Sequence, residues 1–141
     1  MPEARFDVMV AGGGTAGVVA AIQSARAGSR TLLVEKTGLL GGTITSGGVA
    51  FPGLFHAWGK QIIAGIGWEL VSRCVTEGGG TFPDFAKPLR HSQHQVRMSG
   101  PLFAALCDEA VLGAGAHLCL HTLLADVDWD GSAWKVTLCG K

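Results

Sequence analysis

The feature that most constrains this chain is a run of glycines, GGGTAG at residues 12–17, between a predicted strand and a predicted helix. Phe6 to Ala11 is a short apolar run, typical of a strand buried on both faces. Thr15 to Ala27 repeats apolar residues at helical spacing, and Gly28 follows as a helix stop. Thr31 to Glu35 is a second apolar run. Together these segments predict a β-α-β unit with parallel strands and a right-handed crossover.

Composition supports a folded domain and excludes several classes of protein. Of the 141 residues, 48% are hydrophobic and 16% charged, which is too apolar for a disordered chain. The longest apolar runs, such as residues 62–68, fall far short of the roughly 20 residues that span a bilayer. Eleven basic and eleven acidic side chains give zero net charge. We therefore expect neither nucleic acid nor a membrane as a partner.

The cysteines and the N-terminus favour a cytoplasmic protein. The four cysteines lie far apart without a CxxC pair, which predicts buried reduced thiols. They are Cys74, Cys107, Cys119 and Cys139. Residues 1–5 lack the basic and apolar segments of a signal peptide. We expect no metal site, because His91 and His94 have no third ligand nearby in the sequence.

The middle of the chain is predicted to be less regular. Residues 36–59 have the glycine content of a long loop, and Lys60 to Glu77 predicts a helix weakened by two glycines. Residues 78–98 are irregular. Ser99 is a predicted N-cap for a helix that runs to about Leu112.

The last part of the chain predicts a β-hairpin. His117 to Trp129 and Ala133 to Cys139 have strand patterns, and Asp130-Gly131 between them is a turn signal. Trp129 and Trp134 flank this turn and are expected to pair across the hairpin.

The glycine run matches the GxGxxG pattern of dinucleotide-binding turns. Gly12 permits a tight turn, Gly14 lets a pyrophosphate approach the backbone, and Gly17 lets the helix pack closely on the sheet. The helix N-terminus offers unpaired N–H groups to phosphates. Glu35, 18 positions after Gly17, would accept hydrogen bonds from ribose hydroxyls and repel the 2′-phosphate of NADP. The sequence thus predicts an α/β, Rossmann-like FAD/NAD(P)-binding fold with a central parallel sheet.

The residues after Glu35 favour one kind of dinucleotide. Residues 40–48 are LGGTITSGG, where a dehydrogenase of the ordinary NAD type would continue into another helix and strand. With GGGTAG and the acidic strand end, this segment resembles the FAD-binding fold of the glutathione-reductase type. More narrowly, the pattern GGGxAG…E…LGGxxTxG resembles the FAD-dependent oxidoreductases. The resemblance covers nearly the whole chain and is most specific over residues 7–48.

The resemblance implies a set of FAD-binding residues. The residues that would hold the pyrophosphate are Gly12, Gly13, Gly14, Thr15, Ala16 and Gly17, and those that would hold the adenosine ribose are Glu35 and Lys36. The residues that would lie along the pyrophosphate and ribitol are Gly41, Gly42 and Thr43, and those near the isoalloxazine are Thr45, Ser46, Gly47 and Gly48. The strand residue beside adenine would be Leu124. No His lies near Gly42 or Thr43, so we expect FAD to be bound non-covalently.

We expect residues 1–141 to form one incomplete FAD-binding domain. Within it, residues 36–59 would be a loop on the flavin side, residues 60–98 a helical or irregular insertion, and the hairpin an added element. The second flavin motif of similar proteins, Ala-Thr-Gly followed by Gly-Asp, does not occur in this sequence. No catalytic residue is assigned, since these and most of the substrate pocket are expected beyond Lys141. The chain alone is therefore expected to be inactive.

The predicted function is flavin-mediated oxidation or reduction of a small molecule. Two alternatives within enzymes are an NAD-binding dehydrogenase and a relative of thiazole synthases that uses the turn for a dinucleotide substrate. A third alternative is a nucleotide-binding module without catalysis. His56, just after the predicted loop, is a candidate proton donor to a substrate, although a structural role is favoured.

Overall fold

A computed structural model describes residues 4–87 and 90–140 of the chain. Residues 1–3, on which part of the signal-peptide argument rests, and Lys141 lie outside the described residues. So does the side chain of His91, one of the two histidines considered as metal ligands.

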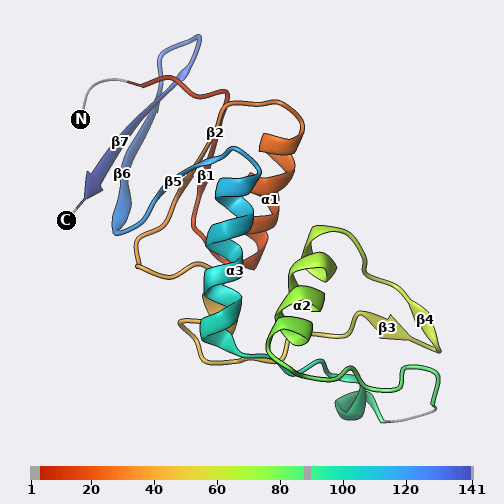
Figure 1. The fold of residues 1–141 in the computed structure, drawn as a ribbon. Helices are drawn as coiled ribbons and strands as arrows, with labels where there is room; N and C mark the ends of the chain where they lie inside the picture. Colours follow the sequence, from red (N-terminus) through yellow and green to blue (C-terminus); the bar gives the residue numbers. More distant parts are fainter. Residues whose placement is uncertain (1–3, 88–89, 141) are drawn as a thin grey trace.

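The centre of the molecule is a three-stranded parallel sheet in the order β1-β2-β5 (Figure 1). Its strands are β1 (Val8–Ala11), β2 (Thr31–Val34) and β5 (His117–Cys119). All four residues of β2 are buried, as predicted for a strand covered on both faces. Helix α1 (Thr15–Arg26) joins β1 to β2, which confirms the predicted β-α-β unit.

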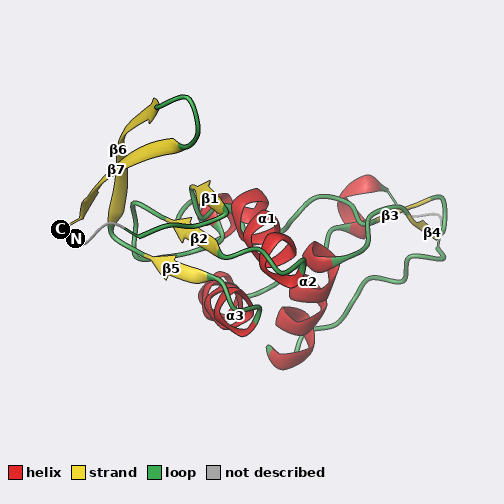
Figure 2. Ribbon diagram, turned by 90° about the horizontal axis from the view of Figure 1, so that it is seen from above, coloured by secondary structure: helices red, strands yellow, loops and turns green. Residues whose placement is uncertain are grey.

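One face of the sheet is covered by helices. Helices α1 and α3 (Gly100–Gly113) lie on this face, and the hairpin of β6 (Thr122–Trp129) and β7 (Trp134–Gly140) projects away from the sheet on the other side (Figure 2). Helix α2 (Ile66–Glu77) packs against α1 and α3. The core between these elements is apolar, and fully buried members include Val18, Ile22, Leu33, Cys107 and Val111.

The start of α3 follows the sequence prediction. The Ser99 hydroxyl accepts a hydrogen bond from the Leu102 N–H at 3.4 Å, and a proline lies in the first turn. The helix ends at Gly113, one residue later than expected. Capping of a free N–H and the fixed φ of proline thus define this end of the helix.

The predicted helix over residues 60–77 is wrong in its first third. Lys60–Gln61 forms strand β4, which pairs with β3 (His56–Ala57), and the helix begins only at Ile66. Gly65 has φ 77° and ψ −156°, a conformation that glycine adopts and that ends any helical path. The apolar pattern continues across Gly65, which is why the sequence suggested one longer helix.

The predicted strand over residues 117–129 is two strands. His121 has φ 51°, so the chain turns there between β5 in the sheet and β6 in the hairpin. The hairpin turn is as expected, because an Asp130 carboxylate oxygen accepts the Ser132 and Ala133 N–H groups, each at 2.8 Å. The Trp129 and Trp134 rings pair across it with centroids 5.1 Å apart, which confirms that prediction.

The loops contain two short 3-10 helices, η1 (Gly42–Ile44) and η2 (His91–His94). Among the cysteines, Cys74 and Cys107 are buried free thiols, as predicted, and burial raises the pKa of Cys107 to about 12. Cys139 is exposed, however, because it lies on the outer strand of the hairpin. The prediction of burial is therefore confirmed for the helix cysteines, holds only in part for Cys119 in β5, which is half-buried, and is wrong for Cys139.

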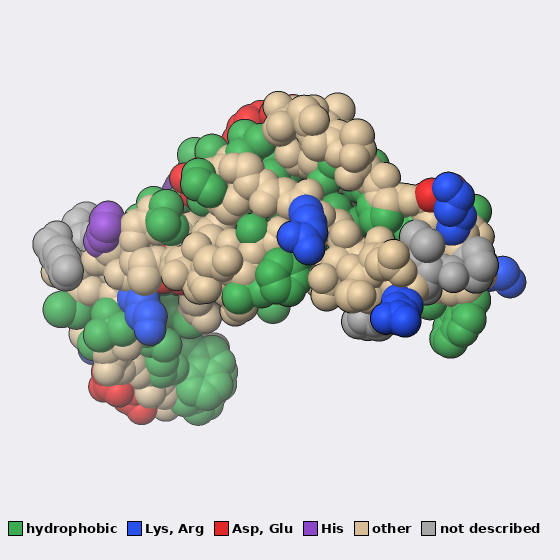
Figure 3. Space-filling view, turned by 90° about the horizontal axis from the view of Figure 1, so that it is seen from below, with side chains coloured by type: hydrophobic (Ala, Val, Ile, Leu, Met, Phe, Trp, Pro, Cys, Tyr) green, Lys and Arg blue, Asp and Glu red, His purple; other side chains and the backbone are tan. Residues whose placement is uncertain are grey.

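The surface carries scattered charge. On the face shown in Figure 3, Lys and Arg side chains are separated from one another by hydrophobic and uncharged surface. Over residues 4–87 and 90–140, no helix has the length and apolar content needed to cross a bilayer.

Replacing Leu33 with Ala is expected to destabilise the fold strongly. Leu33 is fully buried in the central strand, and removal of its methyl groups leaves a cavity, at a cost of about 2–5 kcal/mol. Urea unfolding of the purified protein measures this. The matched control is Leu112→Ala on α3, where Leu112 is 58% exposed and the change should stay within about 0.5 kcal/mol. Equal effects of the two substitutions would contradict this placement of the core.

Candidate functional site

The two glycine segments, residues 12–17 and 41–48, meet at the start of α1. The Gly41 N–H donates to the Gly13 carbonyl at 2.8 Å, and Gly14 and Gly41 form an isolated parallel bridge. A Cβ atom at Gly42 would lie only 2.9 Å from the Gly14 Cα atom. The approach is therefore possible only because residue 42 has no side chain.

Three glycines of the first segment are required by the chain's own packing. Gly12 has φ 103°, and its N–H donates to the Val34 carbonyl at 2.8 Å. A Cβ atom at Gly17 would overlap the Gly12 carbonyl oxygen, and one at Gly13 would overlap the Leu40 side chain. These contacts hold the turn between β1 and α1 tightly against the neighbouring loop.

Gly14 has no such requirement. Its φ of −64° suits any residue, and a Cβ atom there would meet no protein atom within 4 Å. The space at the Gly14 Cβ position is therefore open. A glycine that the protein itself does not need is expected where a ligand must approach the backbone.

The N-terminus of α1 offers hydrogen-bond donors toward this space. Gly14 is the N-cap and has no side chain to cap the helix, and the first turn holds no acidic residue. The Val18 N–H donates to the Gly14 carbonyl at 2.9 Å. Within the described ranges, no hydrogen bond reaches the N–H groups of Thr15, Ala16 or Gly17. Such an end is suited to binding an anion.

Glu35 lies beside the same turn, directly after β2. One of its carboxylate oxygens, Oε2, accepts the Gly13 N–H at 2.7 Å. The other, Oε1, accepts the Thr37 N–H at 2.7 Å and the Thr37 hydroxyl at 2.8 Å. The side chain is thus held in one orientation at the edge where the parallel strands end. The neighbouring Lys36 is exposed.

The pKa of Glu35 is lowered even though the residue is buried. Burial by itself raises the pKa, but the hydrogen bonds from Thr37 and Gly13, with the positive charge of Lys36, outweigh it. The carboxylate is therefore ionised at neutral pH. The sequence pattern identified Glu35 but missed Thr37; the only available signal was a hydroxyl residue two positions after the acid.

The second glycine segment forms a compact turn. Gly41 has φ 96° and precedes η1, and a Cβ atom at Gly47 would lie 2.7 Å from the Thr43 carbonyl oxygen. The Thr45 hydroxyl is 2.6 Å from the Leu40 carbonyl and donates to it. Its proton is therefore used inside the chain, and toward a ligand this oxygen can only accept. The Thr43 and Ser46 side chains and the backbone of Gly48 are exposed.

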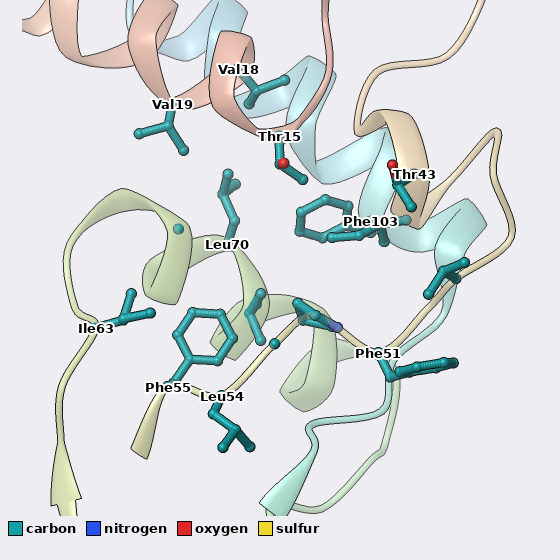
Figure 4. Close-up of a pocket in the computed structure, with 16 residues that line it drawn as sticks. Thr15, Val18, Val19, Thr43, Phe51, Leu54, Phe55, Ile63, Leu70 and Phe103 are labelled. Atoms are coloured by element: carbon teal, nitrogen blue, oxygen red, sulfur yellow. The ribbon is translucent and has the colours of Figure 1, made fainter. Parts of the chain in front are cut away.

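A cavity of about 520 Å³ adjoins this turn. Thr15 and Thr43 place their hydroxyls on one side of it, and Phe51, Phe55 and Leu70 are among the apolar side chains on its other walls (Figure 4). An apolar group placed there would leave water and lie next to the N-terminal end of α1.

Two sequence candidates lie away from the glycine turn. Leu124 is in β6, half-buried and paired with Leu138; its strand begins at Thr122, whose N–H donates to the Glu35 carbonyl at 3.0 Å. The His56 ring stacks on Phe85 with centroids 3.8 Å apart and does not line the cavity. His56 therefore has a packing role in this structure. No cluster of three or more metal-ligating side chains occurs in the described part of the chain.

A family model described as FAD dependent oxidoreductase matches residues 7–141. The chain belongs to this family. The matched region contains both glycine segments and Glu35. The FAD dependent oxidoreductase pattern expected from residues 7–48 is thus confirmed at the level of the family.

Individual relatives are longer than this chain. It is 34% identical over 124 residues to a thiamine thiazole synthase of Aeropyrum pernix, covering 87% of this chain and 39% of the relative. It is 37% identical over 92 residues to a dihydrolipoyl dehydrogenase of Trypanosoma brucei brucei, covering 64% of this chain and 19% of the relative. The chain therefore spans well under half of the curated relatives it matches.

A solved structure shows the same fold at low sequence identity. OxyS anhydrotetracycline hydroxylase from Streptomyces rimosus superposes with a TM-score of 0.60 at 20% identity. The match covers 97% of this chain and 28% of that protein. The Rossmann-type fold predicted from the sequence is confirmed, and the described chain corresponds to one part of a longer fold.

Gly17→Ala is expected to destabilise the protein by about 1–3 kcal/mol, because the new methyl group must displace the Gly12 carbonyl. Thermal or urea unfolding measures the loss. Gly67→Ala is the matched control near the start of α2, where nothing lies within 4 Å of the added Cβ, so stability should be unchanged or slightly higher. Unaltered stability of Gly17→Ala would refute the close contact.

The stabilising effect of Glu35 is expected to depend on pH. Its pKa is lower in the folded protein than the ordinary value of 4.5, so the unfolded chain binds the proton more readily. The contribution is fully present above that value and is lost as the pH falls through the folded pKa. The unfolding free energy of the wild type should exceed that of Glu35→Gln most at neutral pH. A difference independent of pH from 7 to 3 would argue against this role.

Proposed function

We propose that this chain supplies the FAD-binding part of an oxidoreductase that acts on a small molecule. FAD, when bound, supplies the hydride chemistry, and the protein supplies binding and orientation. The chain covers only part of the length of its relatives, so the proposal concerns a protein of the relatives' length that contains this chain.

The observation that supports the proposal is the open space at Gly14. It lies at an uncapped helix N-terminus, between the two glycine segments and beside an ionised carboxylate. A dinucleotide, which carries a diphosphate and ribose hydroxyls, matches this combination. The helix end attracts the diphosphate anion, and the carboxylate accepts hydrogen bonds from the ribose hydroxyls. The residues present therefore fit a dinucleotide.

We assign the parts of FAD to these residues as follows. The N–H groups of Gly14, Thr15, Ala16 and Gly17 would donate to the pyrophosphate, and Glu35 would accept from the ribose. Gly13 would act indirectly, because its N–H already donates to Glu35 and its carbonyl accepts from Gly41. The turn at residues 41–48 would run along the ribitol toward the isoalloxazine, and β6 at Leu124 would lie beside adenine. Binding would be non-covalent.

A second candidate is a thiazole-synthase-like enzyme that uses the same turn for NAD. The identity of 34% to a thiamine thiazole synthase over most of this chain favours it. Thermal shift assays with FAD and NAD separate the two, since the better ligand protects more at equal concentration. Stronger protection by NAD would favour the second candidate. We further propose a cytoplasmic location, in keeping with the buried free thiols of Cys74 and Cys107.

Gly14→Val is expected to remove FAD binding while leaving the fold intact. The added Cβ atom meets no protein atom within 4 Å, and the valine side chain would occupy the space assigned to the pyrophosphate. Visible flavin absorption after reconstitution with FAD and desalting measures retention. In the full-length protein, we expect the wild type to retain flavin and Gly14→Val to lose at least about tenfold in affinity. Residues 1–141 alone, which lack the second flavin motif, are expected to hold FAD weakly or not at all.

The control for this experiment is Gly113→Val at the end of α3. Gly113 also has no neighbour within 4 Å and lies far along the chain from the turn. Both variants should melt close to the wild type. Equal flavin retention by wild type and Gly14→Val would reject the assigned turn, and a full-length wild type that never retains FAD would reject the proposed function.

A further inference from the structure

Thr37 makes a two-point contact with a single carboxylate oxygen. Its N–H and its hydroxyl reach Oε1 of Glu35 at 2.7 and 2.8 Å. The Gly13 N–H reaches the opposite oxygen at 2.7 Å. Three donors on two oxygens prevent rotation of the carboxylate plane, and each bond is strengthened by the negative charge.

Thr37 is itself held in place. Its carbonyl accepts the His121 N–H at 3.0 Å, from the turn between β5 and β6. Its hydroxyl has one proton and two nearby acceptors, Glu35 at 2.8 Å and the Leu39 carbonyl at 3.1 Å. The shorter bond to the charged oxygen is favoured. Thr37 thus connects Glu35 to the segment that leads into β6.

The same turn packs on the residue after Thr37. A Cβ atom at Gly38 would lie 2.7 Å from the His121 ring, so the ring covers this glycine. The Glu35 N–H donates to the Cys119 carbonyl at 2.9 Å, and its own carbonyl accepts from Thr122. Residues 35–38 and 119–122 are therefore joined at several points, with Lys36 and His121 as the ionisable side chains next to the carboxylate segment.

We propose that Thr37 is a positioning residue, which clamps the Glu35 carboxylate in the orientation that receives the ribose hydroxyls of an adenosine dinucleotide. The inference rests on the proposed function, because it assumes that Glu35 contacts ribose. With Oε1 occupied twice and Oε2 once, the Oε2 oxygen keeps a lone pair for a ribose hydroxyl. Without the threonine hydroxyl the carboxylate gains rotational freedom that ligand binding must then remove.

The test compares wild type, Thr37→Val and Thr37→Ser. Valine keeps the shape and the N–H but removes the hydroxyl, whereas serine restores it. In ligand-free protein, carboxyl ¹³C NMR should show the Glu35 titration moved to higher pH in Thr37→Val and returned in Thr37→Ser. ADP, which carries the adenosine ribose but no flavin, should bind roughly 3- to 10-fold more weakly to Thr37→Val. Thr137→Val on exposed β7 is the matched control and should match the wild type in both measurements.

The outcomes separate the inference from the function on which it rests. An unchanged Glu35 titration, or unchanged ADP affinity, in Thr37→Val overturns the positioning role. Failure of the full-length wild type to bind FAD or ADP rejects the proposed function, whatever the titration shows. If Thr37→Val does not fold, Thr37→Ala takes its place, with Thr37→Ser still required to restore both readouts.

Discussion

The close approach of two backbone segments, marked by the hydrogen bond from Gly41 to Gly13, is the constraint on which the site depends. It brings the loop after β2 against the start of α1, and it is possible because Gly42 has no side chain to meet the Gly14 backbone. Gly17 acts in the same way toward Gly12. In the first glycine segment, backbone conformation explains Gly12 and packing explains Gly13 and Gly17, so Gly14 is the one left for a ligand to explain.

A buried charge is the second consequence of this arrangement. Glu35 follows a fully buried strand, where an unpaired carboxylate would be strongly unfavourable. The chain supplies three donors and a neighbouring lysine, so the charged form is favoured despite burial. The carboxyl ends of parallel strands are where α/β folds bind ligands, and here that edge carries a helix N-terminus without a side-chain cap together with an oriented carboxylate.

Several elements were predictable because their determinants are local. The β-α-β unit follows from apolar runs separated by glycines, the start of α3 from a serine followed by proline, and the tryptophan pair from a turn signal. The two wrong predictions, the long helix over residues 60–77 and the long strand over residues 117–129, each fail at a single residue whose backbone conformation the sequence pattern does not show. Gly65 and His121 take positive φ values that the apolar pattern does not reveal, and each divides what looked like one continuous element.

The sequence by itself determined the family pattern and the β-α-β unit, and it supplied most of the candidate site residues, because these depend on residue types at short, regular spacings. The tertiary structure alone decided that residues 12–17 and 41–48 touch, that Gly13 serves Glu35 through its N–H, and that Thr37 clamps the carboxylate. Such contacts depend on how β2, its following loop and the β5–β6 turn pack together. Hydrogen-bond partners across that packing are set by distances that no spacing in the sequence encodes.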